Sequence, residues 1–162
     1  MITGSAPISK EVLSFLKVAF CCQIHEGYGQ TECGGPGSLT WTKDPMVGHV
    51  GSPYSCLKFK LVDVPDMNYT SKDVDETGQP LPRGEICYKG PSAFKGYFRQ
   101  PQATKDTIDS DGWVHTGDIG AFLPHGVIKI VDRKKNIFKL SQGEYIAPDK
   151  IEAKIVMSQY IA

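Results

Sequence analysis

A glycine-rich stretch from Glu26 to Gly37, "EGYGQTECGGPG", holds the first residues whose types and spacing could do chemistry. Glycines let a backbone approach a ligand closely, and their amides can face phosphate oxygens. Tyr28 could stack on a purine ring, and Thr31 could donate its hydroxyl to a phosphate. Glu32 could bind Mg²⁺, which prefers oxygen ligands and shares them with phosphates. The stretch predicts a nucleotide site, but a surface turn with a chance mix of polar residues is equally compatible with it.

Two later segments add groups that suit a nucleotide. The segment "DGWVHTGD" ends in Asp118, directly after a Thr-Gly pair that predicts a turn. An acidic residue after such a turn can accept hydrogen bonds from ribose hydroxyls, as in dinucleotide folds. The segment "VDRKKNIFKLSQGEYIAP" brings together Arg133, Lys134, Lys135 and Lys139. Arginine can bind a ribose or phosphate oxygen through its fork, whereas lysine acts as a point charge. Taken alone, the first segment could be an ordinary turn and the second a solvated strand end.

The composition limits the class of protein. The 162 residues suit one domain or a piece of a larger one, and 40% of them are hydrophobic. The 18 acidic and 18 basic residues balance, which argues against nucleic acid or an anionic membrane as a partner. The five cysteines include no CxxC pair, so neither a disulfide framework nor a zinc site is indicated. No transmembrane or signal segment is evident.

The elements that would position these residues follow from periodicity. Residues 7–20 predict a helix capped by Ser9, with one apolar face formed by Val12, Leu13, Leu16, Ala19 and Phe20. The next stretch, 22–29, predicts a strand that gives way to a glycine loop. Alternation at Leu57, Phe59 and Leu61 predicts another strand. The remaining expectations are a polar loop at 65–83, strands within 84–91 and 126–140, a short helix at 101–108, a turn at 109–112 and a final helix starting near Pro148.

Strands therefore outnumber helices, without the strand–helix alternation of a complete parallel sheet. We expect a mixed α/β fold that is part of something larger. Five segments then resemble one family in order and across essentially the whole chain: "MITGSAPIS", "EGYGQTE", "LVDVPDMNY", "FKGYFRQPQAT" and "DRKKNIFKLSQGEYIAPDKIE". They resemble long-chain fatty acyl-CoA synthetases, which are members of the adenylate-forming (AMP-binding) superfamily.

The resemblance implies a fold and an activity. Residues 1–134 would be the C-terminal portion of the large AMP-binding domain, and residues 135–162 the hinge and the beginning of the small C-terminal lid domain. The family joins a long-chain fatty acid to coenzyme A. The carboxylate attacks the α-phosphorus of ATP and releases pyrophosphate, and the thiol of coenzyme A then displaces AMP. The implied cofactors and co-substrates are ATP/AMP, Mg²⁺ and coenzyme A.

The resemblance also implies the site residues. A loop would lie along the adenine, an aromatic ring would stack on it, two glycines would keep the approach open, and an acid and an arginine would hold the ribose. The implied nucleotide-binding residues are Gly4, Ser5, Ala6, Pro7, Gly27, Tyr28, Gly29, Thr31, Asp118 and Arg133.

The remaining implied roles concern catalysis and movement. Thr31, Glu32 and Lys139 would be catalytic, with Glu32 as the Mg²⁺ ligand and Lys139 near the thioester-forming site. Lys135 would be the hinge, and Gly143 would flank the entry of the coenzyme A arm.

Several parts of the family's machinery have no match here. The family's phosphate-wrapping loop, most of its acyl tunnel and its distal lid lysine are not found in the sequence. Because each charge-stabilising group lost at a transferring phosphate costs a factor on the order of 10² or more, we expect this chain alone to lack useful ligase activity. Unpaired strand edges predict possible self-association. Resemblance implies membrane attachment only through an N-terminal region that this sequence lacks, at the cytosolic face of the endoplasmic reticulum or at the mitochondrial outer or peroxisomal membrane.

Two alternatives stay open at this point. The parent could be another adenylate-forming enzyme, luciferase-like or a medium-chain acyl-CoA synthetase. The chain could also be a non-catalytic AMP-binding or interaction fragment. A substrate panel separates the first alternative, and binding of AMP without turnover favours the second.

Overall fold

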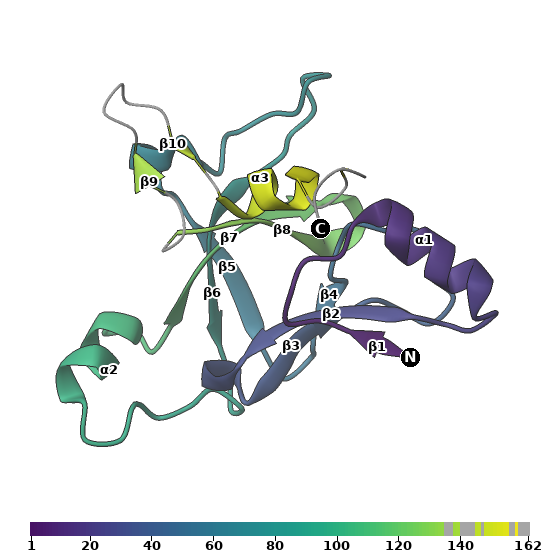
Figure 1. Cartoon of the computed structure of the whole chain (residues 1–162). Coiled ribbons are helices and arrows are strands. Elements are labelled where there is room, and N and C mark those ends of the chain that lie inside the picture. Colours follow the sequence, from purple (N-terminus) through teal and green to yellow (C-terminus); the bar gives the residue numbers. More distant parts are fainter. Residues whose placement is uncertain (135–137, 140–144, 147, 156–157, 159–162) are drawn as a thin grey trace.

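The computed structural model describes residues 1–134, 138–139, 145–146, 148–155 and 158 (Figure 1). The described helices are α1 (Lys10–Ala19), α2 (Pro101–Thr107) and α3 (Pro148–Ile155), with 3₁₀ turns η1 (Thr31–Cys33), η2 (Pro65–Met67) and η3 (Pro124–Gly126). The described strands are β1 (Ile2–Thr3), β2 (His25–Gln30), β3 (Gly35–Leu39), β4 (Ser52–Pro53), β5 (Lys58–Val62), β6 (Arg83–Lys89), β7 (Val114–Leu123), β8 (Val127–Arg133), β9 (Phe138–Lys139) and β10 (Tyr145–Ile146). The expected mixed α/β class is confirmed.

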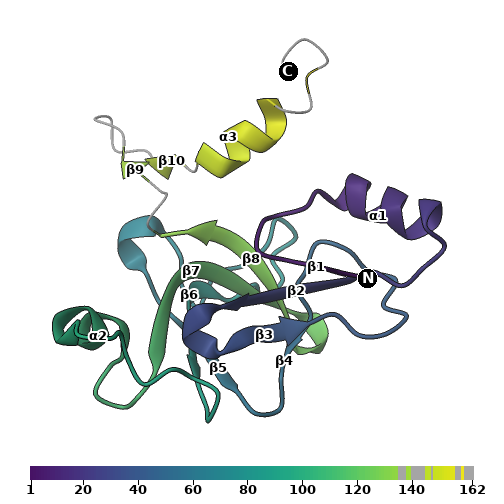
Figure 2. The ribbon, with the colours of Figure 1, turned by 60° about the horizontal axis from the view of Figure 1, so that its bottom comes forward.

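Two four-stranded sheets form the body of the fold (Figure 2). The first has the order β1-β2-β3-β4, with β1 parallel to β2 and the other pairs antiparallel. The second is an antiparallel meander in the order β5-β6-β7-β8. Backbone hydrogen bonds join the sheets, because the Val50 amide donates to the Ile128 carbonyl over 2.8 Å and the Ile128 amide donates to Gly51 over 2.8 Å.

The core lies where the two sheets meet. Val50 precedes β4, and it packs with Ile86 of β6 and Ile128 of β8, all three of them buried. Tyr28 of β2 packs against this cluster from the first sheet. The aromatic ring that the sequence marks for a ligand is therefore held by the core that joins the sheets.

Most expected elements are confirmed. The helix α1 begins after Ser9, whose hydroxyl accepts a hydrogen bond from the Val12 amide over 3.2 Å. The expected strands appear as β5, β6 and β8, and the expected helices as α2 and α3. The apolar face of α1 is only partly covered, because Leu13 is buried whereas Val12 and Phe20 are exposed.

Two expectations about local structure are wrong. The glycine stretch is not a loop, because β2 continues through Gly27 and Gly29 to Gln30. A β-carbon added at Gly29 would lie 2.2 Å from the Gly35 carbonyl oxygen, so glycine serves here to bring β2 and β3 close together. The segment predicted as a turn before Asp118 is part of β7, a ten-residue strand. Its Thr-Gly pair is accommodated by an irregularity within the strand rather than by a chain reversal.

None of the helices described has the length and apolar composition needed to cross a bilayer.

Candidate functional site

A cavity of about 350 Å³ opens where the two sheets and the start of α1 converge. Its walls come from residues 5–10, 26–29, 48–50 and 129–133, together with Asp118. The volume lies at the lower end of the range typical of small-molecule sites, about 300–1,000 Å³. Eight residues that the sequence marks for nucleotide binding line this one cavity: Ser5, Ala6, Pro7, Gly27, Tyr28, Gly29, Asp118 and Arg133.

Three of these lining residues contact one another in a chain of polar groups. The Tyr28 hydroxyl donates a hydrogen bond to Asp118 Oδ2 over 2.8 Å. Arg133 Nε lies 3.4 Å from the other carboxylate oxygen, Asp118 Oδ1. Asp118 is only 8% exposed, whereas the Arg133 side chain is 56% exposed and so forms the outer part of the chain. Each oxygen of the Asp118 carboxylate therefore has its own partner, Tyr28 at Oδ2 and Arg133 at Oδ1.

The electrostatics of this chain are dominated by burial. Burial raises the pKa of the Asp118 carboxyl above its ordinary value, although the Tyr28 hydroxyl and the Arg133 guanidinium act in the opposite direction. Burial, followed by the charge of Asp118, raises the pKa of Tyr28. The Tyr28 side chain is therefore neutral at physiological pH. Its hydroxyl acts as a hydrogen-bond donor and not as a base.

Strand pairing explains why these side chains meet. Asp118 of β7 lies directly opposite Arg133 of β8 in the ladder. Thr3 of β1 lies beside Glu26 of β2, which brings the loop after β1 along the first sheet. A β-carbon at Gly4 would lie 2.9 Å from the Gly27 carbonyl oxygen, so this loop and β2 can approach only because Gly4 has no side chain. Gly4 thus supports the wall without lining the cavity itself.

Glu26 and His49 are two polar residues that line the cavity and that sequence reasoning did not mark. Glu26 Oε2 is buried and has no hydrogen-bond partner among the described residues, and burial raises the pKa of this carboxyl. An unsatisfied buried oxygen beside a cavity is suited to a ligand that donates a hydrogen bond. The signal was available, because Glu26 immediately precedes Gly27 in the same strand.

His49 is the second missed residue. Its Nδ1 accepts a hydrogen bond from the Gly51 amide over 3.1 Å, and its Nε2 lies 3.4 Å from Asp44 Oδ2. Accepting at Nδ1 places the proton on Nε2, facing the carboxylate. His49 follows an unremarkable glycine in a loop, so no local pattern marked it.

The predicted phosphate and metal residues lie outside the cavity walls. Thr31 and Glu32 begin η1 at the end of β2, and Glu32 Oε1 accepts a hydrogen bond from the Tyr97 hydroxyl over 2.6 Å. In the part of the chain that the structure describes, no three His, Cys, Asp or Glu side chains are grouped to hold a metal. Glu32 alone fits Mg²⁺ only where phosphate oxygens and water complete the shell, which is the usual arrangement for this ion.

The remaining predicted residues lie at the end of the chain. Lys139 belongs to β9, which pairs with β10. Lys135 and Gly143, predicted as the hinge and the coenzyme A entry, lie outside the described residues.

A family profile described as "AMP-binding enzyme" matches residues 1–98, more than half of the chain. The chain belongs to the AMP-binding enzyme family. Curated relatives agree with this assignment. The chain is 57% identical over 152 residues to long-chain-fatty-acid–CoA ligase 5 of Mus musculus, covering 94% of this chain and 21% of the relative. It is 53% identical over 162 residues to long-chain-fatty-acid–CoA ligase 1 of Cavia porcellus, covering 100% and 22%.

A plant relative is similar to the same extent. The peroxisomal long chain acyl-CoA synthetase 7 of Arabidopsis thaliana is 52% identical over 162 residues, covering 100% of this chain and 22% of the relative. The chain therefore spans about a fifth of the length of these curated relatives.

Solved structures of AMP-binding enzymes share the fold. The A domain of a carboxylic acid reductase from Segniliparus rugosus, in complex with AMP and a co-purified carboxylic acid, has a TM-score of 0.75 and 36% identity, covering 94% of this chain and 22% of that one. ATP-bound MatB from Rhodopseudomonas palustris has a TM-score of 0.75 and 30% identity, covering 97% and 29%. These similarities confirm that the fold is part of an adenylation domain.

Proposed function

We propose that the whole protein is an ATP-dependent long-chain fatty acid–CoA ligase and that this chain carries the adenosine half of its site. The observation that carries the proposal is the convergence of Tyr28, Asp118 and Arg133 on one cavity, in a chain that is 52–57% identical to long-chain acyl-CoA ligases and synthetases. Relatives and neighbours that act on carboxylic acids support the substrate class.

In this proposal the cavity holds the nucleoside of ATP and then of AMP. Tyr28 offers the face of an aromatic ring to the purine, and Gly27 and Gly29 leave room for the base. Glu26 Oε2 accepts a hydrogen bond from the exocyclic amine of adenine, which satisfies its buried oxygen. Ser5, Ala6 and Pro7 complete the wall of the base subsite, and Gly4 lets their loop approach β2.

Asp118 and Arg133 hold the ribose. The Asp118 carboxylate accepts hydrogen bonds from the two ribose hydroxyls, and Arg133 donates to a ribose oxygen from the exposed side. Hydrogen bonds to a charged group are stronger than neutral ones, about 1.5–3 kcal/mol each. The Tyr28 hydroxyl already donates to the same carboxylate, so the purine and ribose subsites share one oriented group.

The phosphates would extend toward the end of β2. Thr31 donates its hydroxyl to a phosphate oxygen, and Glu32 supplies a carboxylate to Mg²⁺. When bound, the metal would offset negative charge on the departing pyrophosphate. The Tyr97 hydroxyl already donates to Glu32 Oε1 over 2.6 Å, so the other carboxylate oxygen, Oε2, would bind the ion.

The later steps belong to the proposed lid. We place the domain boundary after residue 134, with Lys135 as the hinge, Lys139 near the thioester-forming site and Gly143 beside the entering arm of coenzyme A. The described β8 strand ends at Arg133, so the proposed ribose contact from Arg133 lies two residues before the proposed hinge.

Location and association are also proposals. Peroxisomal relatives support an organelle membrane, and the endoplasmic reticulum and the mitochondrial outer membrane remain candidates. Self-association of this chain would use the edge strand β1, where Ile2 is 74% exposed, and the uncovered side of α1.

The test is fatty acid-dependent exchange of labelled pyrophosphate into ATP, followed by thioester formation with coenzyme A, using the whole protein. Palmitate should support both reactions far better than octanoate or luciferin. A preference for octanoate would favour a medium-chain enzyme, and luciferin-dependent light would favour a luciferase-like one. Binding of AMP by this chain with no acid-dependent exchange by the whole protein would favour a non-catalytic AMP-binding protein.

A further inference from the structure

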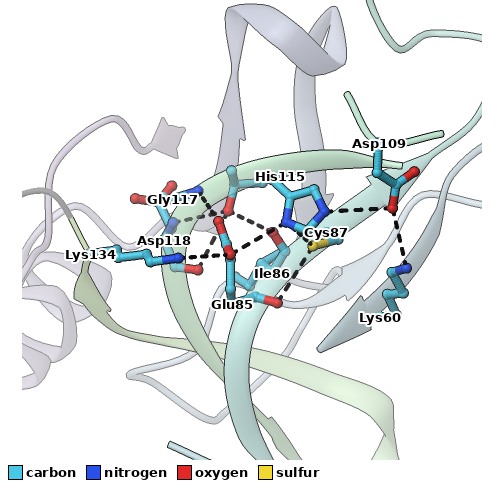
Figure 3. A network of polar contacts seen from close by, with 10 residues as sticks. Lys60, Glu85, Ile86, Cys87, Asp109, His115, Gly117, Asp118 and Lys134 are labelled. Carbon is cyan, nitrogen blue, oxygen red and sulfur yellow. Dashed lines mark hydrogen bonds and ion pairs between the residues drawn. The ribbon is translucent and has the colours of Figure 1, made fainter. Parts of the chain in front are cut away.

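The strand that carries Asp118 is irregular where it passes the middle of β6. Figure 3 shows the polar contacts at this place, with Glu85, Gly117 and Lys134 labelled. In the β6–β7 ladder, Cys87 lies opposite His115 and Glu85 lies opposite Ile119, so β7 uses two more residues than β6 to cover this interval. Side chains take over the hydrogen bonds that a regular ladder would make. The Thr116 hydroxyl donates to the Ile86 carbonyl over 2.8 Å and accepts from the Asp118 amide over 3.0 Å.

Glu85 holds the centre of this irregular segment. The side chain is 8% exposed, and its Oε1 accepts a hydrogen bond from the Gly117 amide over 3.0 Å. Gly117 has a φ of +71°, a conformation that favours glycine. Gly117 pairs with no residue in the register of β6 and β7, so the Glu85 carboxylate supplies its amide with an acceptor.

The same carboxylate closes a ring with the end of β8. Glu85 Oε2 lies 3.4 Å from Lys134 Nζ, and the Lys134 amide donates to the Gly117 carbonyl over 2.8 Å. Gly117 is thus held through both its amide and its carbonyl, one residue before Asp118. Lys134 is held one residue after Arg133. The ring of Glu85, Gly117 and Lys134 therefore fixes the backbone next to both Asp118 and Arg133. None of the three ring residues lines the cavity.

The rest of the cluster does not supply a nucleophile. Cys87 Sγ lies 3.4 Å from His115 Nδ1, and His115 Nε2 lies 3.6 Å from Asp109 Oδ2, an order typical of a catalytic triad. However, Cys87 is fully buried, and burial together with the charge of Glu85 raises its pKa to about 12. The thiol therefore stays protonated and out of reach of a substrate.

We propose that Glu85 is a positioning residue for the nucleotide site: by holding Gly117 and Lys134, it sets the Asp118 carboxylate and Arg133 to receive the ribose hydroxyls. This inference rests on the proposed function, since it concerns how the same cavity recognises its ligand. Glu85 does not line the cavity, so it acts only through the residues it holds.

The test compares AMP with 2′,3′-dideoxy-AMP, which lacks both ribose hydroxyls, by calorimetry on this chain. The wild type should prefer AMP on the order of 10²- to 10⁴-fold, the value of two hydrogen bonds to a charged group. Glu85→Ala should reduce this preference to below about threefold by weakening AMP alone, because the dideoxy nucleotide makes no use of the ribose contacts. Glu85→Gln keeps an acceptor for the Gly117 amide and should retain most of the preference. An equal loss for both nucleotides would show a general structural role and overturn the inference.

Two further measurements keep the result decisive. Glu85→Asp retains the charge but is shorter by one methylene, so it should also lose the preference for AMP. This variant provides the test if Glu85→Ala fails to fold. The matched control Asp109→Asn alters the far end of the same cluster and should leave the preference unchanged.

Hydrogen exchange without nucleotide separates failure of this inference from failure of the proposed function. In Glu85→Ala or Glu85→Asp, the Gly117 amide should exchange at least about tenfold faster than in the wild type, since it loses its acceptor, while the Ile119 amide should stay protected. Unchanged exchange at Gly117 overturns the inference whatever the nucleotide affinity. A different outcome would overturn the proposed ligand instead: the Gly117 amide exchanges faster in the Glu85 variants, but the wild type shows no preference for AMP.

Discussion

Replacing Asp118 with asparagine should separate binding from stability. The carboxylate accepts the Tyr28 hydroxyl over 2.8 Å and lies 3.4 Å from Arg133 Nε. Asparagine keeps one oxygen for Tyr28 but loses the charge, so each of two ribose hydrogen bonds falls from about 1.5–3 to about 0.5–1.5 kcal/mol. The combined loss of about 2–3 kcal/mol corresponds to AMP binding that is about 30- to 140-fold weaker.

The same substitution should cost little stability. Burial raises the pKa of Asp118, which means that the folded protein disfavours the ionised carboxylate relative to the unfolded chain. Removing the charge relieves that penalty and loses a pair whose arginine is largely exposed, a contribution of about 0–1 kcal/mol. The free energy of unfolding should therefore stay within about 1 kcal/mol of the wild type or rise.

The assay is calorimetric titration with AMP beside urea unfolding at neutral pH, with Asp111→Asn as the control. Asp111 is exposed and outside the cavity, so its variant should match the wild type in both measurements. The reasoning is refuted if Asp118→Asn binds AMP as tightly as the wild type. It is refuted equally if the variant loses several kcal/mol of stability, since the carboxylate would then be a structural group.

Three other predictions concern pH, backbone approach and the core. Because the pKa of Asp118 is raised on folding, the wild type should lose stability relative to Asp118→Asn as pH rises from about 4 through the raised pKa. Urea unfolding at several pH values would detect this, and a pH-independent difference in the free energy of unfolding between the two proteins would contradict it. Gly29→Ala places a β-carbon against the backbone of Gly35 and should cost about 1–3 kcal/mol, lowering the melting temperature; an unchanged melting temperature would contradict the close approach of β2 and β3. Ile86→Ala removes a fully buried side chain between the sheets and should cost about 2–5 kcal/mol by urea unfolding, whereas a loss below about 1 kcal/mol would contradict its place in the core.

Local signals in the sequence predicted the helices and the regular strands. Ser9 caps α1 as expected, and the alternation of Leu57, Phe59 and Leu61 gives β5. These features depend on neighbours along the chain, so periodicity and capping chemistry suffice to find them.

The glycine-rich strand and β7 could not be predicted in the same way. Gly27 and Gly29 look like loop residues unless it is known that β3 packs tightly against them. The Thr116–Asp118 segment looks like a turn because of its Thr-Gly pair. It stays within a strand because Glu85, which lies more than thirty positions earlier, accepts a hydrogen bond from the Gly117 amide. Tertiary contacts override local propensity at both places.

The site was predictable to the extent that it uses familiar residue types. Tyr28, Asp118 and Arg133 were marked by the sequence and lie together in the structure. Glu26 was missed because its importance comes from a buried oxygen without a described partner, which is a property of packing rather than of spacing. His49 was missed because it lies in a loop where no local pattern marks it.

The central claim is that Tyr28, Asp118 and Arg133 together hold one adenosine. The most direct measurement is a structure of this chain determined with AMP bound. We predict the purine against the Tyr28 ring and the ribose hydroxyls within hydrogen-bond distance of Asp118. An AMP molecule bound elsewhere, with this cavity filled only by solvent, would contradict the account.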